Sequence, residues 1–368
     1  MDVTFEPEQL ALRESVARLL AGRAGTDIEA WRETWSALAE LGVLAMALPE
    51  RVGGADAGAI EVMIVAQEIG RAGLRQPFVE AVVVAGQLLA ELPDQATVTA
   101  VLDGIADGSR LAVLAHDEPR SRWSTSAWGV TASETEDGWR LTGTKEPVLY
   151  GADADTLLVS AVAADGTRLF LVDAGQDGVS THAGTSFDDT PVARIELADA
   201  RAVPLADAEL THTLLMAASV RALTAYGAEA LGAMEAAVAM TVSYLGTRKQ
   251  FGVPLKAFQA LTHRAADLYV AQELARSLTL HASLALAEGV LDPDIASRLA
   301  VQLSESGRLI GRDAIQLHGG VGMTAELAVG HYTARLEAIE RLWGDGRFHL
   351  GRLADTLLDH ESLEFLKG

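Results

Sequence analysis

The sequence contains no cysteine, and its 29 basic residues are far outnumbered by 51 acidic ones, for a formal net charge of −22. Without cysteine the chain forms no disulfide, no thiolate nucleophile and no cysteine-based metal site. A strongly acidic chain is a poor partner for nucleic acid or an anionic membrane surface, because both are negatively charged. These shortages disfavour nucleic-acid and membrane partners but leave room for a local basic pocket that holds a phosphorylated cofactor.

Other common signals are also missing. The longest apolar runs are rich in alanine and interrupted, so we expect no membrane span. No charged-then-apolar leader opens the chain, and we expect a cytoplasmic protein. The nine histidines are scattered, with no helical i, i+4 pair between carboxylates, so we predict no metal site. The sequence has neither a Gly-x-Ser-x-Gly elbow nor a phosphate loop ending Gly-Lys-Ser/Thr.

What is present is a succession of helical, extended and again helical periodicity. Residues 1–110 repeat with the period of a helix, which predicts helices at 6–20, 31–41, 44–50, 61–71, 79–92 and 95–107. From residue 111 the period falls to two, which predicts strands at 111–115, 129–131, 139–142, 157–161, 168–172 and 193–197. The helical period then returns and predicts helices at 206–245, 255–287, 293–317, 330–342 and 347–360. We therefore expect a mainly α, α+β protein with a helical domain at 1–110, a small β-domain at 111–205 and a helical bundle at 206–368.

Two long predicted helices meet at a tight corner in residues 244–255. Gly252 and Pro254 end the first helix there, shortly after Arg248 and Phe251. Arginine grips a phosphate through two parallel hydrogen bonds and stays charged, and the phenyl ring offers a flat apolar surface beside it. A solvated helical corner is the plain alternative for this stretch taken alone.

A second glycine-rich stretch ends another long predicted helix. It runs from Gln316 through His318, Gly319 and Gly320. Glycines at a helix end let the backbone approach a ligand closely. His318 is either a structural residue of this turn or one that faces a cofactor.

Together the two stretches resemble the acyl-CoA dehydrogenase family, which carries an Arg-x-x-Phe-Gly corner and a Gln-x-x-Gly-Gly turn in this order and at this separation. Residues 38–71 also look like the family's N-terminal helical domain, so the resemblance covers nearly the whole chain. It implies a helical domain, a middle β-barrel and a C-terminal helical bundle, with FAD as cofactor. In the family these stretches hold the pyrophosphate and adenosine end of FAD, usually that of the neighbouring subunit. The residues implied are Arg248, Phe251, Gln316, Gly319 and Gly320.

The resemblance also implies an activity. Family members remove the α proton of an acyl-CoA thioester with a carboxylate base, and FAD accepts the β hydride. The expected protein is thus a flavoprotein oxidoreductase of fatty-acid or steroid side-chain β-oxidation. Its expected partners are an acyl-CoA, electron-transfer flavoprotein as electron acceptor, and related subunits in a homo- or hetero-tetramer.

The residues that would perform the chemistry depart from the family pattern. Aligned on the glycine turn, the family's Tyr-Glu-Gly-Thr becomes Leu-Trp-Gly-Asp, which puts Trp343 at the position of the base. A second base position used by some members, counted back from the corner, falls on Ala222. Neither side chain can take a proton. Two carboxylates could substitute for the base: Glu229, two turns beyond Ala222, and Asp345, two residues beyond Trp343.

The flavin-ring side departs as well. The family's Thr-Glu-Pro with its later Gly-Ser-Asp becomes Asp-Glu-Pro-Arg-Ser-Arg-Trp at 117–123. Leu149 replaces a threonine whose hydroxyl would reach the flavin ring. Pro147 has no amide hydrogen to donate to a neighbouring strand. This pattern favours a subunit of a hetero-oligomer whose partner supplies the glutamate, like actinobacterial relatives that lack it. There are two alternatives. One is an autonomous homo-oligomeric enzyme that uses Glu229 or Asp345 as the base, and the other is a non-catalytic structural subunit.

The predicted helix before Trp343 carries a charged face. Its members are Arg335, Glu337, Glu340 and Arg341. Their spacing is typical of i, i+4 pairing on a solvated surface, and we expect that here.

Overall fold

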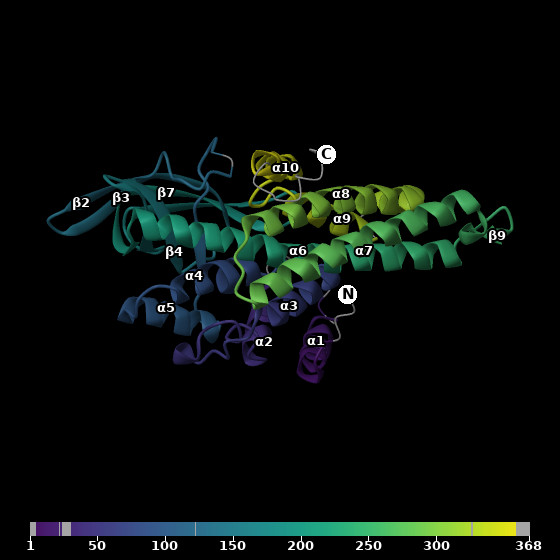
Figure 1. Ribbon diagram of the computed structural model, residues 1–368, viewed down its shortest axis with the longest axis horizontal. Coiled ribbons are helices and arrows are strands. Elements are labelled where there is room, and N and C mark those ends of the chain that lie inside the picture. The colour runs from purple at the N-terminus through teal and green to yellow at the C-terminus, as the bar shows by residue number, and fades with distance from the viewer. Residues whose placement is uncertain (1–4, 22, 24–30, 122, 325–326, 358–368) are drawn as a thin grey trace, which may run out of the picture.

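The computed structural model describes residues 5–21, 23, 31–121, 123–324 and 327–357. Strands gather at one end of the elongated molecule, and three long helices run from there to the other end (Figure 1). The shorter N-terminal helices lie along one side of these long helices. The mainly α, α+β architecture predicted from the sequence is confirmed.

The N-terminal part is helical. Its α-helices are α1 (Pro7–Leu20), α2 (Trp31–Glu40), α3 (Ala59–Ala72), α4 (Gln87–Ala90) and α5 (Ala96–Ala106), joined by the 3₁₀-helix η2 (Glu50–Val52) and the π-helix η3 (Phe78–Gly86). The helix predicted at 44–50 is wrong, because these residues form successive turns. Leu44 and Leu48 are buried in the core, so the apolar pattern here reflects burial and not a helix. Pro49 precedes η2 with an extended backbone.

The middle part is a small closed barrel. Its strands are β1 (Ala112–Ala115), β2 (Thr131–Thr135), β3 (Gly138–Leu149), β4 (Thr156–Ala163), β5 (Gly166–Asp173), β6 (Val179–Thr185) and β7 (Pro191–Ala206). The pairings β4–β2–β3–β7–β5 return to β4 and close the ring, while β1 extends from β4 and β6 from β7. The ladder between β3 and β7 shifts register between Lys145 and Val148, where Pro147 has no amide hydrogen to donate.

The C-terminal part is a helical bundle built around the 40-residue helix α6 (Ala208–Thr247). A two-stranded hairpin, β8 (Lys249–Gln250) and β9 (Val253–Pro254), and the 3₁₀-helix η4 (Leu255–Ala257) lead into α7 (Gln259–Ala287). The chain continues through α8 (Pro293–His318), η5 (Gly319–Met323), α9 (Val329–Ile339) and α10 (Gly346–Asp355). The predicted helix 347–360 extends beyond the described residues, which end at 357.

Helix α6 packs directly against α3 of the N-terminal part. A Cβ on Gly232 would lie 1.9 Å from the backbone oxygen of Gln67, and one on Gly70 would lie 1.8 Å from that of Glu229. The two backbones therefore touch, which only glycine permits at these points. The domain limits 1–110, 111–205 and 206–368 stay a prediction. Among the described helices none has the length and apolar character needed to cross a bilayer.

Candidate active site and cofactor-binding corner

The corner after α6 presents a cation and an aromatic ring to solvent. Arg248 caps α6 with an extended backbone, is exposed, and forms no ion pair with a described residue. Phe251 is 92% exposed and has a positive φ of 52°, which holds it at the tip of the β8–β9 hairpin. The ring is thus free to contact a ligand or another chain beside Arg248.

The glycine turn lies against the same corner. His318 is buried at the end of α8, its Nδ1 is 2.8 Å from the carbonyl oxygen of Ala314, and its ring lies 4.6 Å from that of Tyr244. Because Tyr244 stands one turn before Arg248, this stacking joins the ends of α6 and α8. The contacts give His318 a structural role.

The glycines themselves face open space. Gly319 has a φ of 66°, and a Cβ on Gly319 or Gly320 would meet nothing within 4 Å. Gln316 is exposed on the last turn of α8. The structure thus brings an arginine, an aromatic ring, an amide and a bare backbone to one end of the bundle, a set that fits a phosphate-containing cofactor.

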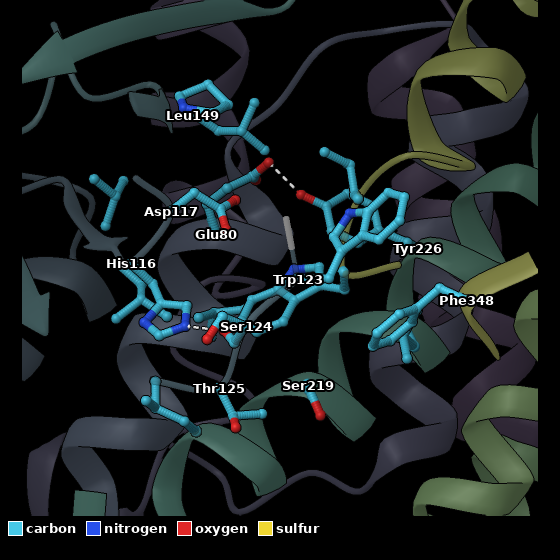
Figure 2. A pocket seen from close by; sticks show the side chains of 18 of the residues that line it. Glu80, His116, Asp117, Trp123, Ser124, Thr125, Leu149, Ser219, Tyr226 and Phe348 are labelled. Carbon is cyan, nitrogen blue, oxygen red and sulfur yellow. Dashed lines mark hydrogen bonds between the residues drawn. The ribbon is translucent and has the colours of Figure 1, made fainter. Parts of the chain in front are cut away.

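A cavity lies at the other end of α6, next to the barrel, where the resemblance implies the flavin ring and the acyl group. Figure 2 shows its lining, to which η3, the barrel, α6 and the segment 342–352 all contribute. Its volume is about 120 Å³. Pockets for drug-sized ligands or cofactors measure roughly 300–1,000 Å³. This cavity is smaller than such a pocket, and a second hollow of about 520 Å³ adjoins it at Asp117, Trp123 and Pro147.

Two tryptophans line this cavity. Trp123 donates from Nε1 to the carbonyl oxygen of Arg341 at 3.0 Å, and its ring lies 5.4 Å from that of Phe348. Trp343 lines the cavity and packs against Val220 and Leu223 of α6. Together with Leu149 they line the cavity where the barrel meets the segment between α9 and α10.

The candidate bases lie elsewhere. Asp345 caps α10 by accepting from the amide of Phe348 at 2.8 Å, and it lines a more open neighbouring hollow. Glu229 is 2% exposed, accepts from Arg335 at 2.6 Å and does not line the cavity. Ala222 is fully buried. None of the three places a carboxylate in the cavity.

Arg335 is the centre of a buried ionic network. Its guanidinium contacts Glu229 at 2.6 Å and Asp188 at 3.0 Å, and it is 2% exposed. Asp188 in turn lies 3.5 Å from Arg75. The expected surface pairing is wrong for Arg335 and confirmed for Arg341 with Glu337, at 3.4 Å. The network joins all three parts of the chain.

The barrel side of the cavity carries a second polar cluster. Lys145 Nζ donates to Glu118 at 2.7 Å, and to Ser160 at 3.0 Å. His116 lies 2.8 Å from the same serine oxygen, and burial lowers its pKa to about 4, so it is neutral. Burial raises the pKa of Asp117 to about 6 at the mouth of the cavity. A carboxylate here does not replace the threonine hydroxyl that the family aims at its flavin.

Two residues at the inner end of the cavity, Glu80 and Tyr226, were not predicted from the sequence. The tyrosine hydroxyl donates to Glu80 Oε1 at 2.5 Å, and both side chains are buried. A single glutamate inside the apolar run 78–86 was the available signal, since an unpaired buried carboxyl is rare. Its partner lies 146 positions away, so no local pattern reveals the pair.

The corner and the cavity are well separated. Arg248 follows Tyr226 by 22 residues of one helix, roughly 33 Å along its axis. The corner and the cavity therefore lie toward opposite ends of α6.

Comparisons with known proteins show the family of the chain. Residues 6–109 match the family described as Acyl-CoA dehydrogenase, N-terminal domain, and residues 218–358 match Acyl-CoA dehydrogenase, C-terminal domain. The chain is 30% identical to acyl-CoA dehydrogenase FadE27 of Mycobacterium tuberculosis over 89% of its own length and 88% of that protein's.

Two solved structures are similar throughout. One is a variant of the Tcur3481–Tcur3483 steroid ACAD, with a TM-score of 0.87 and 30% identity over 96% of this chain and 98% of that one. The other is the ChsE4–ChsE5 complex from Mycobacterium tuberculosis, with a TM-score of 0.87 and 28% identity over 98% of this chain and 100% of that one.

Proposed function

Because this chain belongs to the acyl-CoA dehydrogenase family, whose cofactor is FAD, we propose that it acts as one subunit of a hetero-oligomeric acyl-CoA dehydrogenase. In this assembly its corner holds the far end of a FAD whose ring lies in a partner subunit. The partner supplies the catalytic carboxylate. Two of the similar structures, Tcur3481–Tcur3483 and ChsE4–ChsE5, are each named as a pair of chains, which supports a hetero-oligomer.

The observation that carries the proposal is Trp343 at the position of the family base. Its indole cannot take a proton, and with Trp123 it lines a neighbouring cavity of about 120 Å³. At the family position of the base this chain therefore has no carboxyl group. Leu149 on the cavity wall also withholds the hydroxyl that would hydrogen-bond to a ring.

The corner supports the other half of the proposal. Arg248 is the charged group for the pyrophosphate, and Phe251 is the apolar surface for the adenosine end. Gln316 supplies an amide, and Gly319 and Gly320 leave their backbone bare on the same side. When bound, FAD supplies the hydride acceptor. The corner residues of this chain orient that FAD. They lie roughly 33 Å along the axis of α6 from the cavity of this chain.

The alternative of an autonomous enzyme requires Glu229 or Asp345 as the base. Glu229 would first have to leave Arg335, its partner at 2.6 Å in a buried network. Asp345 would have to give up its hydrogen bond to the first turn of α10. Both costs argue for a base on the partner.

For the substrate we propose an acyl-CoA with a steroid-derived acyl group. The support is the steroid ACAD named among the similar structures, at 30% identity over nearly the whole chain. Electron-transfer flavoprotein is the proposed electron acceptor. Turnover of the complex with steroid side-chain and straight-chain acyl-CoA esters tests the substrate, and a preference for straight chains contradicts it.

The test of function is expression of the chain alone and with a family member that carries the glutamate. We expect the chain alone to be colourless and inactive, and the complex to be yellow and active. Arg248→Ala lowers the flavin content of the complex, whereas Arg201→Ala, an exposed arginine on the barrel, leaves it unchanged. Turnover by the pure homo-oligomer that Glu229→Gln or Asp345→Asn abolishes would instead make the chain autonomous.

A further inference from the structure

His318 lies where the two halves of the cofactor-binding corner meet. Helix α6 ends directly before Arg248, and α8 ends at His318, directly before Gly319 and Gly320. The side chain of His318 is only 3% exposed. One buried ring therefore stands between the arginine and the bare backbone that the proposed function assigns to the same FAD.

The direction of this ring is fixed by contacts with two helices. Its Nδ1 lies 2.8 Å from the carbonyl oxygen of Ala314, one turn earlier in α8. Because a carbonyl oxygen can only accept, Nδ1 is the donor. Across the helix boundary the ring lies 4.6 Å from that of Tyr244, tilted by 34°, a separation at which aromatic rings attract each other. The hydrogen bond thus orients the imidazole so that it packs on α6.

The glycine turn η5 also packs on His318. A Cβ on Gly322 would lie 3.0 Å from the Cβ of His318 and 2.8 Å from the carbonyl oxygen of Ile315. The turn therefore folds back onto the last turn of α8, and only glycine fits at this point. A displacement of His318 is passed directly to the turn that carries Gly319 and Gly320.

On the α6 side, the stacked tyrosine is tied to the arginine. The amide of Arg248 donates to the carbonyl oxygen of Tyr244 at 2.9 Å, and the carbonyl oxygen of Arg248 accepts from the amide of Leu255 at 2.8 Å. These bonds fix the backbone of Arg248 relative to Tyr244. The chain of contacts from Arg248 through Tyr244 and His318 to the glycine turn is thus continuous.

We propose that His318 is a positioning residue of the corner, which sets the place of Arg248 relative to Gly319 and Gly320 so that both contact one FAD at once. The identity of the ligand rests on the proposed function. His318 acts through Tyr244 and Arg248 and needs no contact with the cofactor. Groups that are already in place lose less conformational freedom on binding, so affinity depends on this junction.

The first experiment measures deuterium exchange of the full chain without FAD. His318→Leu and Tyr244→Leu both remove the ring pair and should speed amide exchange in 246–252 and 319–323. Tyr244→Phe keeps the ring and should exchange like the native chain. Leu268→Ala, which truncates a fully buried side chain of α7, lowers the urea midpoint but leaves these two segments unchanged. Unchanged exchange in both leucine variants would overturn the proposal.

The second experiment titrates the flavin-free complex with FAD and follows fluorescence. His318→Leu and Tyr244→Leu should raise the Kd at least about tenfold, because the charge-assisted hydrogen bonds of Arg248 to the pyrophosphate are weakened. Tyr244→Phe and Leu268→Ala should leave the Kd unchanged. The double variant His318→Leu, Arg248→Ala should bind little more weakly than Arg248→Ala alone, since both changes act on the same contact.

The outcomes separate this inference from the proposed function. A native Kd in both leucine variants, an equal loss of affinity in Leu268→Ala, or fully additive effects in the double variant would each overturn the positioning role. An unchanged Kd in Arg248→Ala would instead contradict the proposed function of the corner. The exchange experiment needs neither FAD nor partner and tests the junction in either case.

Discussion

Glu80→Gln should remove a pH dependence of stability that the native chain carries. Burial raises the pKa of Glu80 from 4.5 to about 7 in the folded protein. The folded carboxyl therefore binds its proton more tightly than the unfolded one. Its contribution to stability is fully present below pH 4.5 and is lost as the pH rises through about 7. Glutamine has the same shape, keeps the hydrogen bond from Tyr226 and does not titrate.

The magnitude follows from the shift. A change of one pKa unit corresponds to 1.36 kcal/mol, so the shift from 4.5 to about 7 corresponds to roughly 3 kcal/mol. Relative to the native chain, the variant should gain about that much between pH 4.5 and pH 8. Asp117 titrates in the same range and belongs to both proteins, so its contribution cancels in the difference.

The assay is urea unfolding of both proteins at half-unit steps from pH 4.5 to pH 8. Glu134→Gln, in which an exposed carboxyl is replaced, should track the native chain throughout. A difference between Glu80→Gln and the native chain that stays constant with pH would refute the argument. It would mean that Glu80 remains ionised in the fold or is open to water.

Other substitutions test the packing that positions the site. Arg335→Met leaves the buried Glu229 without its cation and Asp188 with Arg75 alone, and should cost about 3–5 kcal/mol in urea unfolding. The exposed Arg341→Met should cost less than about 1 kcal/mol. Gly232→Ala puts a methyl group 1.9 Å from a backbone oxygen of α3 and should cost about 3 kcal/mol or more. Gly246→Ala, on the same helix with nothing within 4 Å, should gain about 0.5–1 kcal/mol; equal effects of the two glycine variants would contradict the close helix contact.

Much of the fold could be predicted because its elements carry their own periodicity. The predicted helix at 293–317 corresponds to α8 (Pro293–His318) within one residue. Strand β6 was not predicted, because its residues are nearly all exposed and show no alternation of apolar and polar side chains. The helix predicted at 79–92 covers nearly all of η3, but its π-helical type was not predicted, since its nine residues are all buried and have no polar face to set a period.

The site was predictable only where local motifs exist. The corner and the glycine turn were recognised by resemblance, and the stacking of His318 on Tyr244 now explains why they lie together. Arg335 was misjudged because the charges that bury it, Glu229 and Asp188, lie 106 and 147 positions away. Spacing along one helix cannot reveal such partners.

The central claim is that this chain serves a flavin whose ring lies in another subunit while its own ring site stays closed. The most direct measurement is the flavin content of the purified complex, from absorbance and amino-acid analysis. The account predicts one FAD for each pair of unlike chains, and loss of that FAD in Arg248→Ala. One FAD for every chain would contradict it.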